Sequence, residues 1–187
     1  MLFPLPEYSA CIWISGFTAK PKDLDIVVHA IQEKYPDVSV QFADMIKVPG
    51  SRYLFLATLN ALKSFLSKPI SKSLGMEILL YVAANRQISE AIRLVGITPT
   101  TEKITAVLVG RTEQEALGAA ELLSVIIGQK GSDVLIDSWS NERIRNVRAI
   151  FEIGSKELKA TLRENETKTQ AVERLAIERP ALLSIRR

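Results

Sequence analysis

Apolar and polar positions over the first 45 residues predict a strand, a helix and a second strand. Residues 10–17 are apolar almost throughout, as in a buried strand. In residues 23–34 the apolar positions recur at helical intervals, which is typical of an amphipathic helix. Apolar and polar side chains then alternate from Val38 to Phe42, as in a half-buried strand.

The middle of the chain has a helical pattern that leads into a third strand. Residues 53–66 predict a strongly apolar helix, and residues 75–96 predict two short helices that meet at a polar elbow, Asn85-Arg86-Gln87. Asn85 suits the N-cap of the second short helix and Gly96 its C′ position. The β-branched run 104–109 predicts a central strand. The expected apolar stripes are Phe55, Leu59, Leu62 and Leu66 in the long helix, and Ile88, Ala91, Ile92 and Val95 after the elbow.

The last third of the chain is predicted to be almost entirely helical. Thr112 and Glu115 form a capping box that opens a helix over residues 114–127. A helical pattern follows from 141 to 178, with interruptions near Gly154 and Asn165, and Pro180 is expected to end it and leave a short tail, 180–187.

The order of these elements predicts the fold class. We expect an α/β (α+β) protein with a helix-rich single domain over residues 1–187 and a small mixed β-sheet covered by helices. The pattern alone leaves open whether the strands pair in parallel or mixed fashion.

Composition excludes several classes of protein. Of the 187 residues 47% are hydrophobic, enough for a real core and against disorder. The apolar runs are too short to span a bilayer, and the N-terminus has no pattern of a secretory signal. Cys11 is the only cysteine, so no intrachain disulfide forms and a reducing cytoplasm is the expected compartment.

The sequence offers no convincing catalytic centre, metal site or cofactor site. Cys11 and the only histidine, His29, are too few for a zinc site and fit structural roles better than catalytic ones. No glycine-rich phosphate loop consensus occurs. Gly110-Arg111, before the capped helix, leaves open a small-molecule-binding α/β domain, although a well-capped turn is the simpler interpretation.

The distribution of charge directs attention to the elbow. The net charge is +3, but no Asp or Glu occurs between Met45 and Met76. The cations in that segment are Lys47, Arg52, Lys63, Lys68 and Lys72. Clustered cations favour contact with phosphates, and Asn, Gln and Arg can read the edges of unpaired bases. The low aromatic content, 6%, predicts a small RNA footprint.

The elbow and the helix before it resemble a known family. Met76-Glu-Ile-Leu79, followed by Arg86-Gln-Ile-Ser-Glu-Ala-Ile92 and a glycine, is similar to the hallmark of the kinase-binding subunit of the KEOPS/EKC complex, of archaeal type. Ala171-Val-Glu-Arg-Leu-Ala176 resembles the final helix of that family. The resemblance implies a non-catalytic subunit that binds the small atypical kinase/ATPase of the complex. It also implies support of threonylcarbamoyladenosine formation beside the tRNA anticodon, with tRNA held by its CCA end.

The resemblance also suggests site residues. We expect Lys68, Lys72, Asn85, Arg86 and Gln87 to contact RNA, and the tail residues Leu182, Leu183 and Ile185 to dock the kinase. No metal, cofactor, membrane or small-molecule substrate is expected. Three alternatives stay open: an adaptor without RNA contact, a tail that packs on its own domain, and a structural role in the elbow for Arg86 and Gln87.

Overall fold

The computed structural model describes residues 1–19 and 24–183. The chain divides into two compact units, each assembled from two separate segments. The first, here called the sheet unit, comprises residues 1–45 and 97–136; the second, the helical unit, comprises 46–96 and 137–187. The prediction of a single domain therefore stays a prediction, whereas the α+β class is confirmed.

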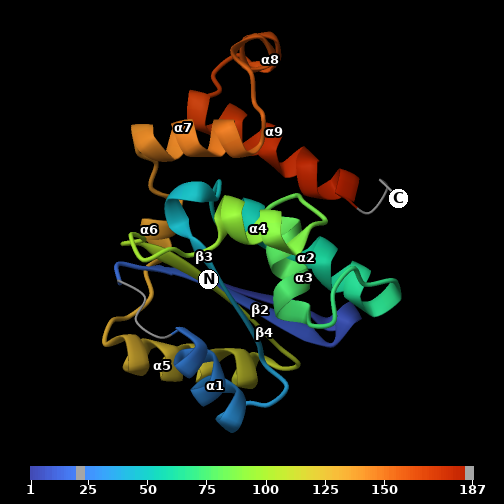
Figure 1. The fold of residues 1–187 in the computed structure, drawn as a ribbon, viewed down its shortest axis with the longest axis vertical. Helices are drawn as coiled ribbons and strands as arrows, with labels where there is room; N and C mark the ends of the chain where they lie inside the picture. Colours follow the sequence, from blue (N-terminus) through green and yellow to red (C-terminus); the bar gives the residue numbers. More distant parts are fainter. Residues whose placement is uncertain (20–23, 184–187) are drawn as a thin grey trace. The chain divides into compact units, whose positions relative to one another are not determined.

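The sheet unit contains one four-stranded sheet (Figure 1). Its strands are β1 (Leu2–Leu5), β2 (Ala10–Phe17), β3 (Ser39–Asp44) and β4 (Ile104–Gly110), in the order β1-β2-β4-β3. Three of them match the predicted strands, and β4 lies inside the sheet as expected. The N-terminal edge strand β1 was not anticipated, because Pro4 interrupts its pattern and proline suits only an edge.

The prediction of a mixed sheet is wrong, because every neighbouring pair of strands is antiparallel. β2 and β3 run in the same direction, but they are not adjacent. Strand β4 lies between them and runs antiparallel to both. All seven residues of β4 are buried, which is why this apolar segment takes an interior place.

Two helices cover one face of this sheet, α1 (Leu24–Lys34) and α5 (Glu113–Ile127), and they pack against each other. Their buried side chains join those of the strands in one core, which includes Phe17, Ile31, Phe42, Leu108 and Leu123. The predicted capping box is confirmed: Thr112 Oγ1 accepts the Glu115 N–H at 3.2 Å. Three short elements remain: the 3₁₀ turn η1 (Pro6–Tyr8) in the sheet unit, and the 3₁₀ turn η2 (Met45–Lys47) and helix α6 (Asp133–Asp137) where the chain passes between the two units.

The helical unit consists of six helices among the residues that the structure describes. They are α2 (Ser51–Ser67), α3 (Leu74–Val82), α4 (Ile88–Val95), α7 (Asn141–Ile150), α8 (Ser155–Thr161) and α9 (Lys168–Leu183). Helix α3 packs against α2, α4 and α9, so that its residues 77–82 are all buried. A helix that is apolar on every side belongs at the centre of a packed unit.

Helix α2 confirms the predicted element but not the predicted stripe. Its buried residues are Ser51, Tyr53, Leu54, Ala57, Thr58, Ala61 and Leu62. Leu66, which the stripe placed in the core, is 63% exposed. The small residues Ala57 and Ala61 let neighbouring helices approach α2 closely. The face of α2 that carries them is therefore buried, although the predicted stripe has larger apolar side chains.

The expectation that Pro180 ends the last helix is also wrong. Helix α9 continues through Pro180 to Leu183, and both residues are buried. A proline inside a helix loses one backbone hydrogen bond and strains the preceding turn. Burial of the two side chains offsets part of that cost. The interruptions predicted near Gly154 and Asn165 are confirmed by the gaps between α7, α8 and α9.

Within the described part of the chain, no helix is long and apolar enough to cross a membrane.

Candidate functional site

A buried carboxylate organises the loop between α2 and α3. Glu77 of α3 is 0% exposed. Its carboxylate accepts the Ile70 N–H at 3.0 Å, the Ser71 N–H at 2.8 Å and the Ser64 hydroxyl at 2.8 Å. A buried carboxylate persists only with such donors around it. Glu77 therefore fixes the path of the loop that presents Lys68 and Lys72.

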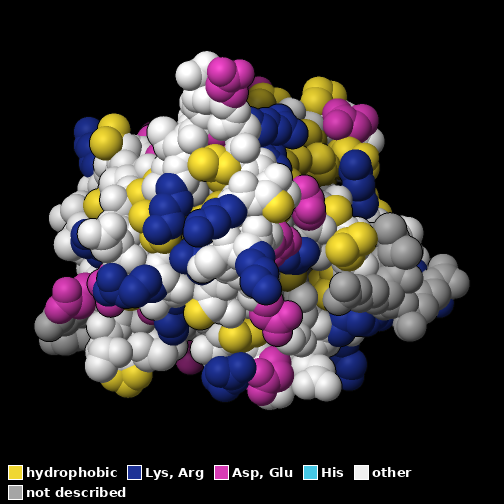
Figure 2. Space-filling model, turned by 90° about the horizontal axis from the view of Figure 1, so that it is seen from above, with side chains coloured by type: hydrophobic (Ala, Val, Ile, Leu, Met, Phe, Trp, Pro, Cys, Tyr) yellow, Lys and Arg dark blue, Asp and Glu magenta, His cyan; other side chains and the backbone are white. Residues whose placement is uncertain are grey.

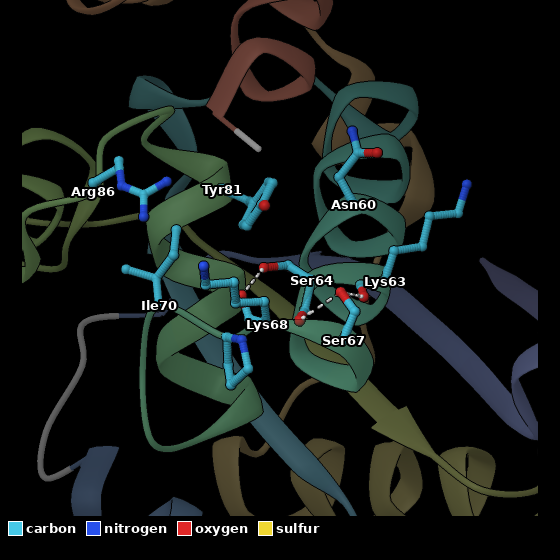
Figure 3. Close-up of a pocket in the computed structure, with 9 residues that line it drawn as sticks. Asn60, Lys63, Ser64, Ser67, Lys68, Ile70, Tyr81 and Arg86 are labelled. Carbon is cyan, nitrogen blue, oxygen red and sulfur yellow. Dashed lines mark hydrogen bonds between the residues drawn. The ribbon is translucent and has the colours of Figure 1, made fainter. Parts of the chain in front are cut away.

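Beside this loop lies a pocket of about 460 Å³ within the helical unit (Figure 3). It is lined by Asn60, Lys63, Ser64, Ser67, Lys68, Pro69, Ile70, Tyr81 and Arg86. Three of these lining residues are cationic and none is a carboxylate. Residues of α2, the following loop, α3 and the elbow thus line a cavity whose positive charge suits an anion.

Two of the predicted RNA-contacting residues meet in this pocket. Lys68 is the C-cap of α2, where its N–H donates to the Ser64 carbonyl at 2.8 Å, and the residue is exposed. Arg86 reaches the pocket from the elbow. Lys72 is exposed on the loop but does not line the pocket. The structure adds Lys63, which the sequence reasoning counted only as part of the acid-free segment.

Arg86 also has a structural contact. Its Nη1 donates to the Leu183 carbonyl at 3.1 Å, at the C-terminal end of α9. A cation at a helix C-terminus interacts favourably with the helix dipole. This bond holds the Arg86 side chain in place beside the pocket.

The elbow residues Asn85 and Gln87 lie outside the pocket. The N-cap of α4 is Gln87, not Asn85; the Asn85 side chain instead accepts the Gln87 N–H at 2.9 Å. The prediction that Gly96 takes the C′ position is likewise wrong, because Gly96 is the C-cap of α4. Gly96 has an extended backbone, and a Cβ there would lie 2.3 Å from the Ile92 carbonyl oxygen, so glycine is required by close approach.

The predicted kinase-docking tail is mostly the last turn of α9. Leu182 is 38% exposed, whereas Leu183 is 5% exposed and packs inward. Leu183 is therefore a core residue, because the helix continues past Pro180 and turns this side chain toward the unit. Ile185 lies outside the described residues.

Large apolar side chains are also exposed on α4. Ile88 and Ile92 are 44% and 47% exposed, whereas Ala91 and Val95 are buried. The predicted stripe thus has a buried half and a half that faces solvent. Ile88 and Ile92 are one helical turn apart, so they form a short apolar strip on the surface.

The remaining candidates fit structural roles. Arg111 forms an ion pair with Asp37 at 3.1 Å, and its N–H donates to Glu115 at 2.8 Å, so carboxylates occupy the start of α5. Burial raises the pKa of the Cys11 thiol. No group of three His, Cys, Asp or Glu side chains suited to a metal occurs among residues 1–19 and 24–183.

Surface charge by itself does not single out a site. On the face drawn in Figure 2, Lys and Arg side chains are interspersed with acidic and hydrophobic ones. The pocket is distinguished instead by which side chains converge on it.

Comparison with known families decides the identity. Residues 22–184 match the family model described as kinase binding protein CGI-121. The chain belongs to this family. No curated protein matches the chain. The CGI-121 match confirms the predicted resemblance to the kinase-binding KEOPS/EKC subunit and indicates a kinase as partner.

Sequence reasoning missed Glu77 and Tyr81 as members of the site. Glu77 is the only charged residue in the apolar run from Met76 to Ala84, and a lone carboxylate in a buried helix is a signal that it holds donors from elsewhere. Nothing in the sequence distinguishes Tyr81 from an ordinary core tyrosine.

Proposed function

We propose that this CGI-121 protein is a non-catalytic, cytoplasmic subunit of a KEOPS complex that binds both its small atypical kinase/ATPase and tRNA. In this role it holds tRNA by the single-stranded CCA end and supports threonylcarbamoyladenosine formation beside the anticodon. Family membership supports the kinase partner. The RNA contact is supported by one observation above all: Lys63, Lys68 and Arg86 line a pocket whose described lining includes no carboxylate.

The pocket suits an RNA backbone in both charge and hydrogen bonding. Lysine and arginine neutralise phosphates, and the Asn60 amide offers polar contacts to phosphate, ribose or base. The Ser64 and Ser67 hydroxyls donate within the chain and can only accept from ribose or base. The cavity is small, which favours a strand end over a long groove. In this proposal Lys72 assists from the rim, while Asn85 and Gln87 shape the elbow.

The RNA contact is tested by charge reversal. Lys68→Glu should weaken binding of a CCA-ended tRNA by tenfold or more, because one phosphate contact is lost and replaced by repulsion. The slope of log K against log salt concentration should become shallower by about one. Lys72→Glu should have a smaller effect. Fluorescence anisotropy at several salt concentrations measures both quantities.

Two controls sharpen this experiment. Lys156→Glu on α8 makes the same change of net charge at an exposed lysine outside the pocket and should leave affinity nearly unchanged. Removing the CCA end from the tRNA should abolish the difference between wild type and Lys68→Glu. Equal losses for Lys68→Glu and Lys156→Glu would favour the adaptor without RNA contact, with only nonspecific charge effects.

The kinase-docking surface is proposed at the exposed end of α9, around Leu182. The alternative surface is the α4 strip, since Ile88 and Ile92 are also exposed. Leu182→Glu and Ile92→Glu separate the two, because each puts a charge on an exposed position that should tolerate it. The variant that loses kinase binding in a pull-down while keeping its unfolding midpoint identifies the surface.

A further inference from the structure

The side chain of Tyr81 ends in an unpartnered hydroxyl. Tyr81 is 0% exposed, and its Oη atom has no hydrogen-bond partner among the described residues. A buried hydroxyl without a partner costs free energy that a phenylalanine at the same place would not. A fold that keeps such a group beside a cavity suggests that the partner is a ligand.

Tyr81 lines the same pocket as Lys63, Lys68 and Arg86. Figure 3 shows its ring between helices α3 and α2, the latter carrying Asn60 and Ser64. The backbone of α3 is held at this point, since Tyr53 Oη donates to the Val82 carbonyl at 2.8 Å. The ring is therefore carried by a rigid element at the floor of a cationic cavity.

The chemistry of the surroundings identifies what the hydroxyl would meet. The cations on the pocket lining favour an anionic oxygen, and no described residue of the lining is a carboxylate. Glu77, which anchors the adjoining loop, already accepts donors from Ser64, Ile70 and Ser71. A phenol that donates to a phosphate oxygen forms a short, charge-assisted hydrogen bond. Phosphodiester oxygens combine the required charge and acceptor capacity.

We propose that the Tyr81 hydroxyl donates a hydrogen bond to a backbone phosphate oxygen of the RNA strand bound in this pocket. The inference rests on the proposed RNA-binding function and adds a neutral, buried donor to the cations already assigned. In the ligand-free chain the hydroxyl is covered, so the strand reaches it as lining side chains move. Lys68 is exposed and has a flexible stem, so its ammonium group can pair with the same phosphate.

Tyr81→Phe tests the proposal, because it removes only the hydroxyl. The urea midpoint of the free full-length protein should stay the same or rise. Affinity for a CCA-ended single-stranded RNA should fall by about tenfold, the usual size for a hydrogen bond to a charged group. Tyr53→Phe is the matched control: its hydroxyl bonds a backbone carbonyl, so its loss should lower the midpoint with little effect on RNA affinity.

Two results would overturn the proposal. Unchanged RNA affinity in Tyr81→Phe would mean that the hydroxyl does not meet the ligand. A lower midpoint would mean that water satisfies the hydroxyl in the free protein and that any loss of affinity reflects the fold. If wild type binds RNA and Lys68→Glu does not, while Tyr81→Phe binds normally, the inference about Tyr81 fails and the proposed function stands.

Discussion

At the scale of single residues, Glu77 has the largest structural influence on the site. It is a buried carboxylate whose acceptors are filled by two backbone N–H groups of the preceding loop and one serine hydroxyl. The loop carries Lys68 and Lys72, so the carboxylate acts on the pocket through their placement. Glu77 can therefore be required for RNA binding without contacting the RNA itself.

Replacing Glu77 should be strongly destabilising. Glu77→Ala leaves two N–H groups and a hydroxyl without their acceptor, and we expect the free energy of unfolding to fall by about 3 kcal/mol or more. Urea denaturation measures the loss. Glu90→Ala is the control, because Glu90 forms an exposed pair with Arg93 at 2.7 Å and its replacement should leave the urea midpoint nearly unchanged. Similar losses in both variants would contradict this account of Glu77.

Ala84 ends α3 in a left-handed conformation, with φ of 49°. The Asn85 N–H donates to the Leu80 carbonyl at 3.0 Å, which completes a C-terminal capping motif usually built on glycine. Ala84→Gly should therefore raise the free energy of unfolding by up to about 1 kcal/mol, since relief of backbone strain exceeds the entropy cost.

Ala83→Gly provides the comparison for Ala84→Gly. Ala83 has helical backbone angles and is buried, so glycine there should destabilise by about 1 kcal/mol. Thermal unfolding of both variants distinguishes strain at residue 84 from a general effect of glycine. Equal destabilisation by the two substitutions would show that Ala84 is not strained.

At the scale of elements, an ion pair ties the loop before α9 to that helix. Arg174 donates from Nε to Glu166 Oε1 at 2.9 Å and from Nη2 to Oε2 at 2.9 Å, and the Arg163 N–H adds a third bond at 3.1 Å. The hydrogen bonds from Arg174, together with that from the Arg163 backbone, lower the pKa of Glu166 to about 2. Through these two hydrogen bonds Arg174 of α9 holds the loop between α8 and α9 against the helix.

This pair predicts a pH dependence of stability. The folded-state pKa lies below the unfolded value, so the stabilisation is complete above about pH 5 and is lost as the pH falls toward 2. Glu166→Gln should therefore reduce the drop in urea midpoint between about pH 5 and pH 3. Glu164→Gln, on the same loop, should follow wild type. An unchanged pH profile in Glu166→Gln would show that the pair does not form in solution.

At the scale of the whole molecule, the candidate RNA site belongs to one of the two units. All lining residues of the pocket come from the helical unit, as does the exposed Leu182. The modest net charge of +3 provides little long-range attraction, so binding should depend on the few cations of the pocket.

The salt dependence of wild-type binding tests this view. For about three phosphate contacts on a single strand, the slope of log K against log salt should be about −2. Titration of a CCA-ended single-stranded RNA between about 50 and 200 mM salt measures it. A slope steeper than about −5 would indicate that the RNA binds a broad basic surface instead of a compact pocket.

The sequence by itself determined most of the elements and the family. Periodicity located β2, β4 and α5 almost to the residue, because each pattern reflects local burial, and the motif around Met76 and Arg86 led to the family that the comparison confirmed. The sequence could not determine strand pairing, which depends on contacts between distant segments. It also could not follow α9 past Pro180, because burial of Pro180 and Leu183 outweighs a local rule.

Only the tertiary structure decided which polar residues act together. Lys68 and Arg86 meet in a pocket because α2, α3 and the elbow pack around the buried Glu77, whereas Asn85 and Gln87, adjacent to Arg86 in sequence, lie outside it. The sequence also could not show that the Tyr81 hydroxyl has no hydrogen-bond partner among the described residues, since this is a property of its surroundings. Local patterns fix local structure, but the convergence of side chains depends on how the helices pack.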